Sequence, residues 1–295
     1  MDRYRKCRSE FCGKLKTFIV TKGMIHFRSL YNNIIERLRA YISHIPRLER
    51  ILGLPIIFIS LWLILLLFMP FIENIYGENG FTLGIVLSVI LQALAVLSIL
   101  IKSIGIRRTT FMAVGVILLT WIIEAIGVAT GFPFGRYYYT EKLQPQLLNV
   151  PVLIPLAWLM MLPPSWAIAQ RITGQKKGIK FTILSGLAFI AWDLFLDPQM
   201  VKWGLWAWDK PDGYFGIPFI NFLGWFVSAI FITLFVRPQK LPERPLLLIY
   251  SLTWIMETVG LIVFWDLRGP ALCGFIGMGV FILLAYFKSG EKTCM

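Results

Sequence analysis

Hydrophobic residues in this chain are gathered into long runs separated by short polar breaks. Each run has roughly 18 to 23 residues with few charges, and a helix of that length crosses the hydrocarbon core of a bilayer. The predicted membrane-spanning helices are residues 51–69, 81–101, 111–130, 150–170, 179–197, 214–236, 246–265 and 270–287. The expected fold class is therefore all-α, a polytopic membrane helix bundle of about eight transmembrane helices.

The composition supports this class. Apolar residues make up 57% of the chain and charged residues 15%, with a mean hydropathy of +0.71. Soluble domains have about 45–50% apolar and about 25% charged residues, so a water-soluble globule is excluded. We expect a transmembrane bundle at 51–287, a basic cytoplasmic arm at 1–50 and a cytoplasmic tail at 288–295.

The Lys and Arg residues predict the orientation of the bundle. If the N-terminus is cytoplasmic, 24 of the 29 basic residues lie on the cytoplasmic side and 5 on the other. The asymmetry alternates loop by loop, as the positive-inside rule requires of eight helices with both termini in the cytoplasm. We therefore expect a multi-pass protein of the cell membrane.

The net charge of +13 is explained by contact with anionic lipid headgroups, so nucleic acid is not an expected partner. Within the arm, residues 25–42 place Ile34, Ile35, Leu38 and Ile42 on one helical face. This pattern favours an interfacial helix on the cytoplasmic leaflet, with local disorder as the alternative. The arm contains no hydrophobic segment followed by a cleavage site, so no signal peptide is expected.

A short internal similarity suggests a duplication. Residues 121–127 (WIIEAIG) resemble residues 254–260 (WIMETVG), and the same shift places the first predicted span on the fifth and the second on the sixth. The similarity is compatible with a parallel four-plus-four repeat, although a match of seven residues also arises by chance.

Four acidic residues inside the predicted spans are the main candidates for chemistry. They are Glu124, Asp193, Asp197 and Glu257, all in the outer half of the membrane, and Asn221 lies at a similar depth. Asp193 and Asp197 share one helical face because they are four residues apart. Acids at this depth are costly unless they face a cavity or a partner, so a shared polar pocket is expected. The alternative for each acid is a structural hydrogen bond to a neighbouring helix.

Aromatic residues are concentrated in the outer loops, as in Gly131–Tyr139 (GFPFGRYYY) and at Trp203, Trp206 and Trp208. An ordinary interfacial belt accounts for most of them. Those next to the acids are candidates to stabilise a positive charge, since a Trp or Tyr face attracts a cation by about 0.5–2 kcal/mol.

Several of these segments resemble one known family. The segments are Glu124 with 131–135 (GFPFG), 147–151 (LLNVP), 154–158 (IPLAW), 191–201 (AWDLFLDPQMV), 204–208 (GLWAW), 214–218 (YFGIP) and 221–225 (NFLGW). Together they resemble the membrane carotenoid hydratases, a family that includes bisanhydrobacterioruberin hydratases and carotenoid 1,2-hydratases. The chain departs from the family pattern at Gln144–Pro145 and at Asn149, where glycine is expected. Asn tolerates the left-handed conformation, so the turn shape is expected to survive.

The resemblance implies a role in carotenoid biosynthesis, with a lipophilic carotenoid as substrate. The implied reaction adds water across the terminal carbon–carbon double bond of an acyclic carotenoid and leaves a tertiary alcohol. Such a reaction needs a proton donor, a held water molecule and a lining that stabilises a carbocation. No nucleotide, flavin or metal motif is present, so no cofactor is expected. Membrane lipid and other enzymes of the pathway are the further partners expected.

The pair Asp193 and Asp197 is the predicted centre of the acid–base chemistry, with Glu124 as a supporting or alternative proton carrier. Asp193, deeper and next to Trp192 in the sequence, is expected to stay protonated. Asp197, before Pro198 and near the interface, is expected to be ionised and to orient water, or else to end its helix. The predicted substrate-binding residues are Trp192, Trp206, Tyr138, Asn221 and Glu257.

Two other functions remain open at this stage. A membrane enzyme that transfers isoprenoid groups would need a second acidic set, for which Asp209 and Asp212 are weak candidates. A proton-coupled transporter of a lipophilic solute would also use buried acids at one depth, but would need a polar pathway to both faces.

Overall fold

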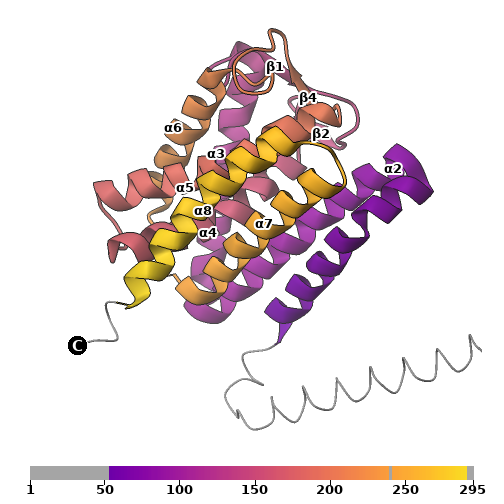
Figure 1. The fold of residues 1–295 in the computed structure, drawn as a ribbon. Coiled ribbons are helices and arrows are strands. Elements are labelled where there is room, and N and C mark those ends of the chain that lie inside the picture. The colour runs from indigo at the N-terminus through magenta and orange to yellow at the C-terminus, as the bar shows by residue number, and fades with distance from the viewer. Residues whose placement is uncertain (1–52, 239–240, 291–295) are drawn as a thin grey trace, which may run out of the picture. The chain divides into compact units, whose positions relative to one another are not determined.

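The computed structural model describes residues 53–238 and 241–290. The helices are α2 (Leu54–Ile104), α3 (Ile106–Thr130), α4 (Leu153–Thr173), α5 (Ile179–Lys202), α6 (Phe219–Val236), α7 (Glu243–Val263) and α8 (Arg268–Gly290). All seven are long and apolar enough to cross a membrane within the described residues (Figure 1). The all-α membrane bundle is confirmed. The interfacial helix predicted in the arm lies outside the described residues.

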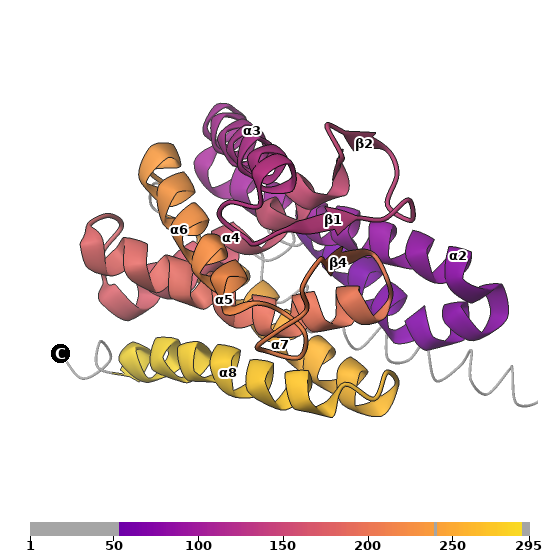
Figure 2. The ribbon, with the colours of Figure 1, turned by 90° about the horizontal axis from the view of Figure 1, so that it is seen from above.

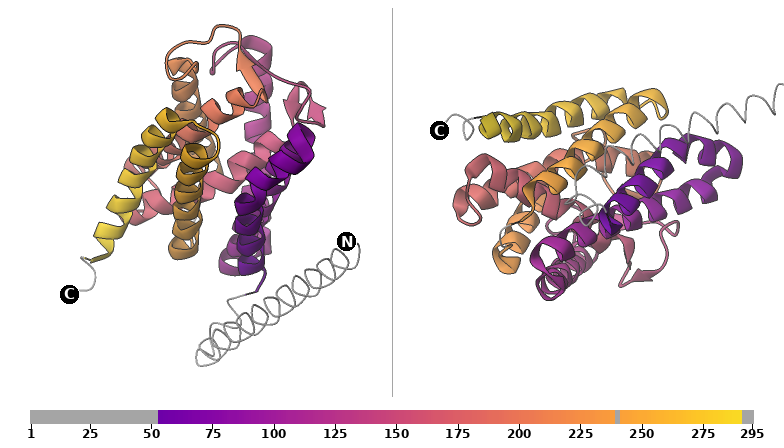
Figure 3. Two further views of the ribbon diagram at one scale, coloured as in Figure 1. Left: turned by 45° about the vertical axis from the view of Figure 1, so that its right-hand side comes forward. Right: turned by 90° about the horizontal axis from the view of Figure 1, so that it is seen from below.

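Helix α2 is folded back on itself at Gly77. A straight helix of its 51 residues would extend about 75 Å, more than twice the hydrocarbon thickness. Gly77 instead adopts φ 63° and ψ −158°, and Trp62 Nε1 donates to Ser88 Oγ across the turn at 3.2 Å. Two antiparallel arms result (Figure 3), and α2 contains residues 54–69 of the first predicted span and all of the second. The count of eight membrane crossings and the four-plus-four repeat stay predictions.

Helix α4 occupies the centre of the bundle and contacts α2, α3, α5, α7 and α8. Most of its side chains are buried, including Trp158 and Trp166. Polar side chains connect it to its neighbours: Trp166 Nε1 donates to Thr233 Oγ1 of α6 at 2.7 Å, and Arg171 pairs with Glu243 of α7 at 3.2 Å. Helix α4 thus packs against each of the three helices that carry the four candidate acids, α3, α5 and α7.

Two small antiparallel sheets lie in the loops at one end of the bundle. Strand β1 (Tyr137–Tyr139) pairs with β4 (Trp206–Trp208), which joins the α3–α4 loop to the α5–α6 loop (Figure 2). Strands β2 (Gln146–Leu147) and β3 (Val150–Pro151) form a hairpin. The two turn residues between them, Leu148 and Asn149, have φ 54° and 61°, the left-handed pair that a two-residue hairpin requires. The conformation predicted for Asn149 is confirmed.

Helix α5 continues past Pro198 to Lys202, so Asp197 does not end it. Proline has no N–H group to donate to the carbonyl four residues earlier, which here belongs to Leu194. The hydroxyl of Tyr214, in the α5–α6 loop, donates to this carbonyl at 2.9 Å. The loop thus supplies the hydrogen bond that the proline removes from the helix.

Candidate active site

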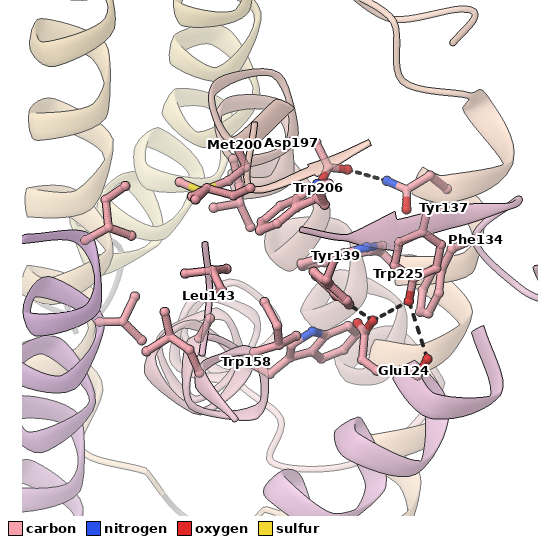
Figure 4. A pocket seen from close by; sticks show the side chains of 18 of the residues that line it. Glu124, Phe134, Tyr137, Tyr139, Leu143, Trp158, Asp197, Met200, Trp206 and Trp225 are labelled. Atoms are coloured by element: carbon pink, nitrogen blue, oxygen red, sulfur yellow. Dashed lines mark hydrogen bonds between the residues drawn. The ribbon is translucent and has the colours of Figure 1, made fainter. Parts of the chain in front are cut away.

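A small cavity lies beneath the β1–β4 sheet and is lined by residues of α2, α3, α4, α5 and α6. It has a volume of about 50 Å³, room for a few water molecules. Its polar lining residues include Glu124, Asp197 and Asn221, and its aromatic walls include Trp158, Trp206 and Trp225 (Figure 4). Three polar residues predicted for the site, each from a different helix, therefore meet in one cavity.

The two aspartates of α5 are joined by one amide group. Asn221 Nδ2 on α6 donates to Asp197 Oδ2 and lies 3.4 Å from Asp193 Oδ2. Trp206 Nε1 of β4 donates to Asp197 Oδ1 at 3.1 Å, whereas Asp193 Oδ1 has no hydrogen-bond partner among the described residues. The amide of Asn221 thus bridges two carboxyl groups one helical turn apart, on the shared face that their spacing predicted.

Glu124 on α3 is held from above by two tyrosines. Glu124 Oε2 accepts hydrogen bonds from the hydroxyl groups of Tyr137 at 2.6 Å and Tyr139 at 2.8 Å (Figure 4). Burial, reinforced by the neighbouring Glu124 charge, raises the pKa of both phenols above the ordinary value. Both therefore keep their protons at neutral pH and act as donors to the carboxyl group.

Aromatic rings surround the acids on the remaining sides. Trp158 and Trp225 stack with ring centroids 4.8 Å apart, and Tyr139 packs edge-on against Trp206 at 5.7 Å. Their faces provide the negative potential that attracts a cation in a dry environment. The cavity therefore combines proton-carrying groups with a lining suited to positive charge.

Three predicted site residues lie elsewhere. Tyr138 is 51% exposed and points away from the cavity, because alternate residues of a strand face opposite sides and Tyr137 and Tyr139 take the inner side. Trp192 and Glu257 line a second cavity, where Gln199 Nε2 donates to Glu257 Oε2 at 3.0 Å. The prediction that Tyr138 lines the site with Glu124 is not met by this geometry.

Two expectations for the aspartates need correction. Asp197 was expected near interfacial water but is 1% exposed, because β4 and its Trp206 fold over the end of α5. Asp193 is fully buried, and Asp197 rather than Asp193 lines the cavity among the described residues. The residue of the pair in position to meet a ligand is therefore Asp197.

Six aromatic residues that line the cavity were not among the predicted site residues. They are Phe134, Tyr137, Tyr139, Trp158, Trp208 and Trp225. Trp158 and Trp225 each end a motif that carries the family resemblance, IPLAW and NFLGW, which was an available signal. The inner position of Tyr137 and Tyr139 depends on the register with β4, which pairs segments almost 70 residues apart.

The fold and the cavity define a class, that of polytopic helical membrane proteins with a buried acidic and aromatic site. Within this class, the chain belongs to the carotenoid biosynthesis protein family, whose model matches residues 84–281, more than half of the chain. The match includes Glu124, Asp193, Asp197 and Asn221.

A curated relative narrows the comparison. The chain is 32% identical over 126 residues to a bisanhydrobacterioruberin hydratase of Haloarcula japonica. The aligned part is 42% of this chain and 43% of the relative, so the chain matches less than half of the length of that protein. No solved structure matches the chain.

Proposed function

We propose that this protein hydrates the terminal carbon–carbon double bond of an acyclic carotenoid end group, as a hydro-lyase that needs no cofactor. The observation on which the proposal depends is that Asn221 bridges Asp193 and Asp197 beneath a cover of tyrosine and tryptophan side chains. Its family and the name of the Haloarcula relative support the substrate class.

The aspartate pair supplies the proton. Two buried carboxyl groups joined by one amide repel each other strongly if both are ionised, so the pair retains one proton. Asp197 presents this proton to the cavity, and the buried Asp193, which does not line the cavity, shares the proton with Asp197. Transfer to the hydrogen-bearing carbon of the terminal alkene forms a C–H bond and leaves a tertiary carbocation.

The walls of the cavity stabilise the cation until water captures it. The faces of Trp158, Trp206 and Trp225 lower the energy of the developing charge without forming a bond to it. Stabilisation that acts only on the charged species accelerates the reaction rather than tightening substrate binding.

Glu124 holds the attacking water. With one oxygen fixed by Tyr137 and Tyr139, the carboxylate accepts a proton as the water oxygen bonds to the cation. The product is a tertiary alcohol. Return of the proton from Glu124 to the aspartate pair restores both groups, so one alkene and one water give one alcohol.

The carotenoid reaches this site from the lipid phase of the cell membrane, end first, with membrane lipid and other pathway enzymes as its surroundings. The alternative of isoprenoid transfer is less well supported, because Asp209 and Asp212 are exposed in a loop while the aspartate pair is buried.

The test is direct. Purified protein in lipid vesicles is incubated with an acyclic carotenoid in water enriched in ¹⁸O. We expect a product heavier by one water molecule that contains the label in a tertiary hydroxyl group. Recovery of unchanged carotenoid, with correctly folded protein, would overturn the proposal.

A further inference from the structure

A second cavity lies next to the first and is larger, with a volume of about 160 Å³. It is bordered by both arms of α2 and by α4, α5 and α7. Leu67 of the first α2 arm and Val259 of α7 line it, as does Phe264 just after α7, and all three side chains are exposed on the outside of the bundle. Because these helices are apolar enough to span a membrane, this border faces lipid.

The two cavities share part of their wall. The residues that line both are Ile85, Val89, Met160, Leu196 and Met200. All five are apolar, and two are methionines, whose unbranched side chains change conformation easily. These side chains separate the two cavities, and a change of the methionine conformations would join them.

The first cavity is too small for more than the end of a long chain. Its roof is closed by the β1–β4 sheet, where Trp208 Nε1 donates to the carbonyl of Phe134 at 3.1 Å. A rod-shaped hydrocarbon with its tip beside Asp197 therefore needs another space for the carbons behind the tip. The second cavity is adjacent, mainly apolar and open toward lipid.

We infer that the second cavity is the entrance and binding channel for the hydrocarbon chain, with its mouth between the first arm of α2 and α7. The inference rests on the proposed function, which it deepens by assigning the path of the substrate. The shared residues form the throat through which the reacting end passes. Glu257 and Gln199 then contact the chain behind the reacting end and not the reacting carbons.

Narrowing the throat tests this path. Val89→Phe adds bulk at a shared wall residue, and Leu87→Phe introduces the same phenyl ring on the exposed face of the same arm. With a full-length carotenoid we expect Val89→Phe to lower the hydration rate about tenfold or more, with the Leu87→Phe rate unchanged. For a short terpene with the same end group, the hydration rate of Val89→Phe should fall less, because this substrate has no chain to fit into the channel.

Blocking the mouth gives a second test that does not depend on catalysis. Val259→Trp and Ile255→Trp lie one turn apart on α7 with similar exposure, 46% and 43%, and Val259 is the one of the two that lines the channel. Both variants are expected to fold, since both side chains are exposed. We expect Val259→Trp to lower the amount of carotenoid bound by detergent-solubilised protein, measured by polyene absorbance, and Ile255→Trp to leave it unchanged.

The outcomes separate the inference from the proposed function. Carotenoid that is bound but not hydrated by the unaltered protein overturns the function, while the Val259→Trp comparison still decides the channel. Normal binding by Val259→Trp together with normal hydration by Val89→Phe overturns the channel. Absence of carotenoid binding by the unaltered protein overturns both.

Discussion

At the scale of single residues, the direction of each side chain decides which groups reach the cavity. Tyr137 and Tyr139 point to Glu124, while Tyr138 between them is exposed. On α5, a spacing of four residues places Asp193 and Asp197 on the same face, but only the one nearer the loops lines the cavity. Adjacent positions in this sequence therefore have different roles.

Asp197→Asn removes the transferable proton and keeps the size of the side chain. We expect the hydration rate to fall by about a hundredfold or more, because general acid catalysis contributes about 10²–10⁴. Rates are measured in vesicles with equal amounts of folded protein. The exposed Asp209→Asn serves as the control and should leave the rate unchanged. A near-normal rate for Asp197→Asn would show that its carboxyl group is structural, with Glu124 as the next candidate for the acid.

The three consecutive tyrosines offer an internally matched comparison. Tyr137→Phe and Tyr139→Phe each remove one of the hydrogen bonds to Glu124, and we expect each to lower the rate by about tenfold, the effect of losing a charge-assisted bond of about 1.5 kcal/mol. Tyr138→Phe removes an exposed hydroxyl group and should leave the rate unchanged. Equal rates for all three variants would contradict the assigned role of Glu124.

At the scale of secondary structure elements, the α3–α4 loop is packed on two helices through glycines. A β-carbon on Gly224 of α6 would lie 2.6 Å from the carbonyl oxygen of Pro133, and one on Gly127 of α3 would lie 2.7 Å from the Phe134 ring. Glycine is needed at these positions because the α3–α4 loop approaches the two helices closely, and not because the backbone has an unusual conformation. Phe134 then lies buried in the wall of the cavity.

Gly224→Ala is expected to destabilise the protein by about 1–3 kcal/mol, because the clash is with backbone that cannot move without displacing the cavity wall. The change is measured as a lower Tm of the detergent-solubilised protein. Gly53→Ala is the control, since a β-carbon there meets no atom within 4 Å. An unchanged Tm for Gly224→Ala would show that the loop moves freely on α6.

At the scale of the whole molecule, the helices place the acids toward one end of the bundle. Strands β1 and β4 lie at that end, and α8 finishes at the opposite one (Figure 1). Arg107 and Arg108 lie in the first turn of α3, and Lys176 and Lys177 lie in the α4–α5 connection, away from the sheet. This separation predicts that the cavity faces the outer half of the membrane.

Cysteine labelling tests the orientation. A membrane-impermeant thiol reagent added from outside should modify Tyr76→Cys, which is exposed beside the turn of α2, and not Lys240→Cys. Labelling from the cytoplasmic side in inverted vesicles should give the opposite result. The native cysteines are first replaced to provide a background without thiols. Reversed accessibility would invert the topology.

Hydropathy and charge alone determined the class of fold, because a bilayer admits few structures besides helices whose backbone bonds are internal. The spacing of Asp193 and Asp197 determined their shared face for a similar reason, since the period of the helix is constant. These features depend on neighbours in the chain, and the structure confirms the membrane helix bundle and places the pair beside Asn221.

Only the tertiary structure decided which groups share the cavity. Glu124 meets Tyr137 and Tyr139 because β1 pairs with β4, and Asp197 is buried because Trp206 of β4 lies over it. Glu257 is at the same predicted depth yet lines the other cavity, since depth along a helix does not specify the direction in which the helix faces. Contacts of this kind depend on how helices pack and on how loops cross between them. The local periodicity of the sequence therefore does not predict them.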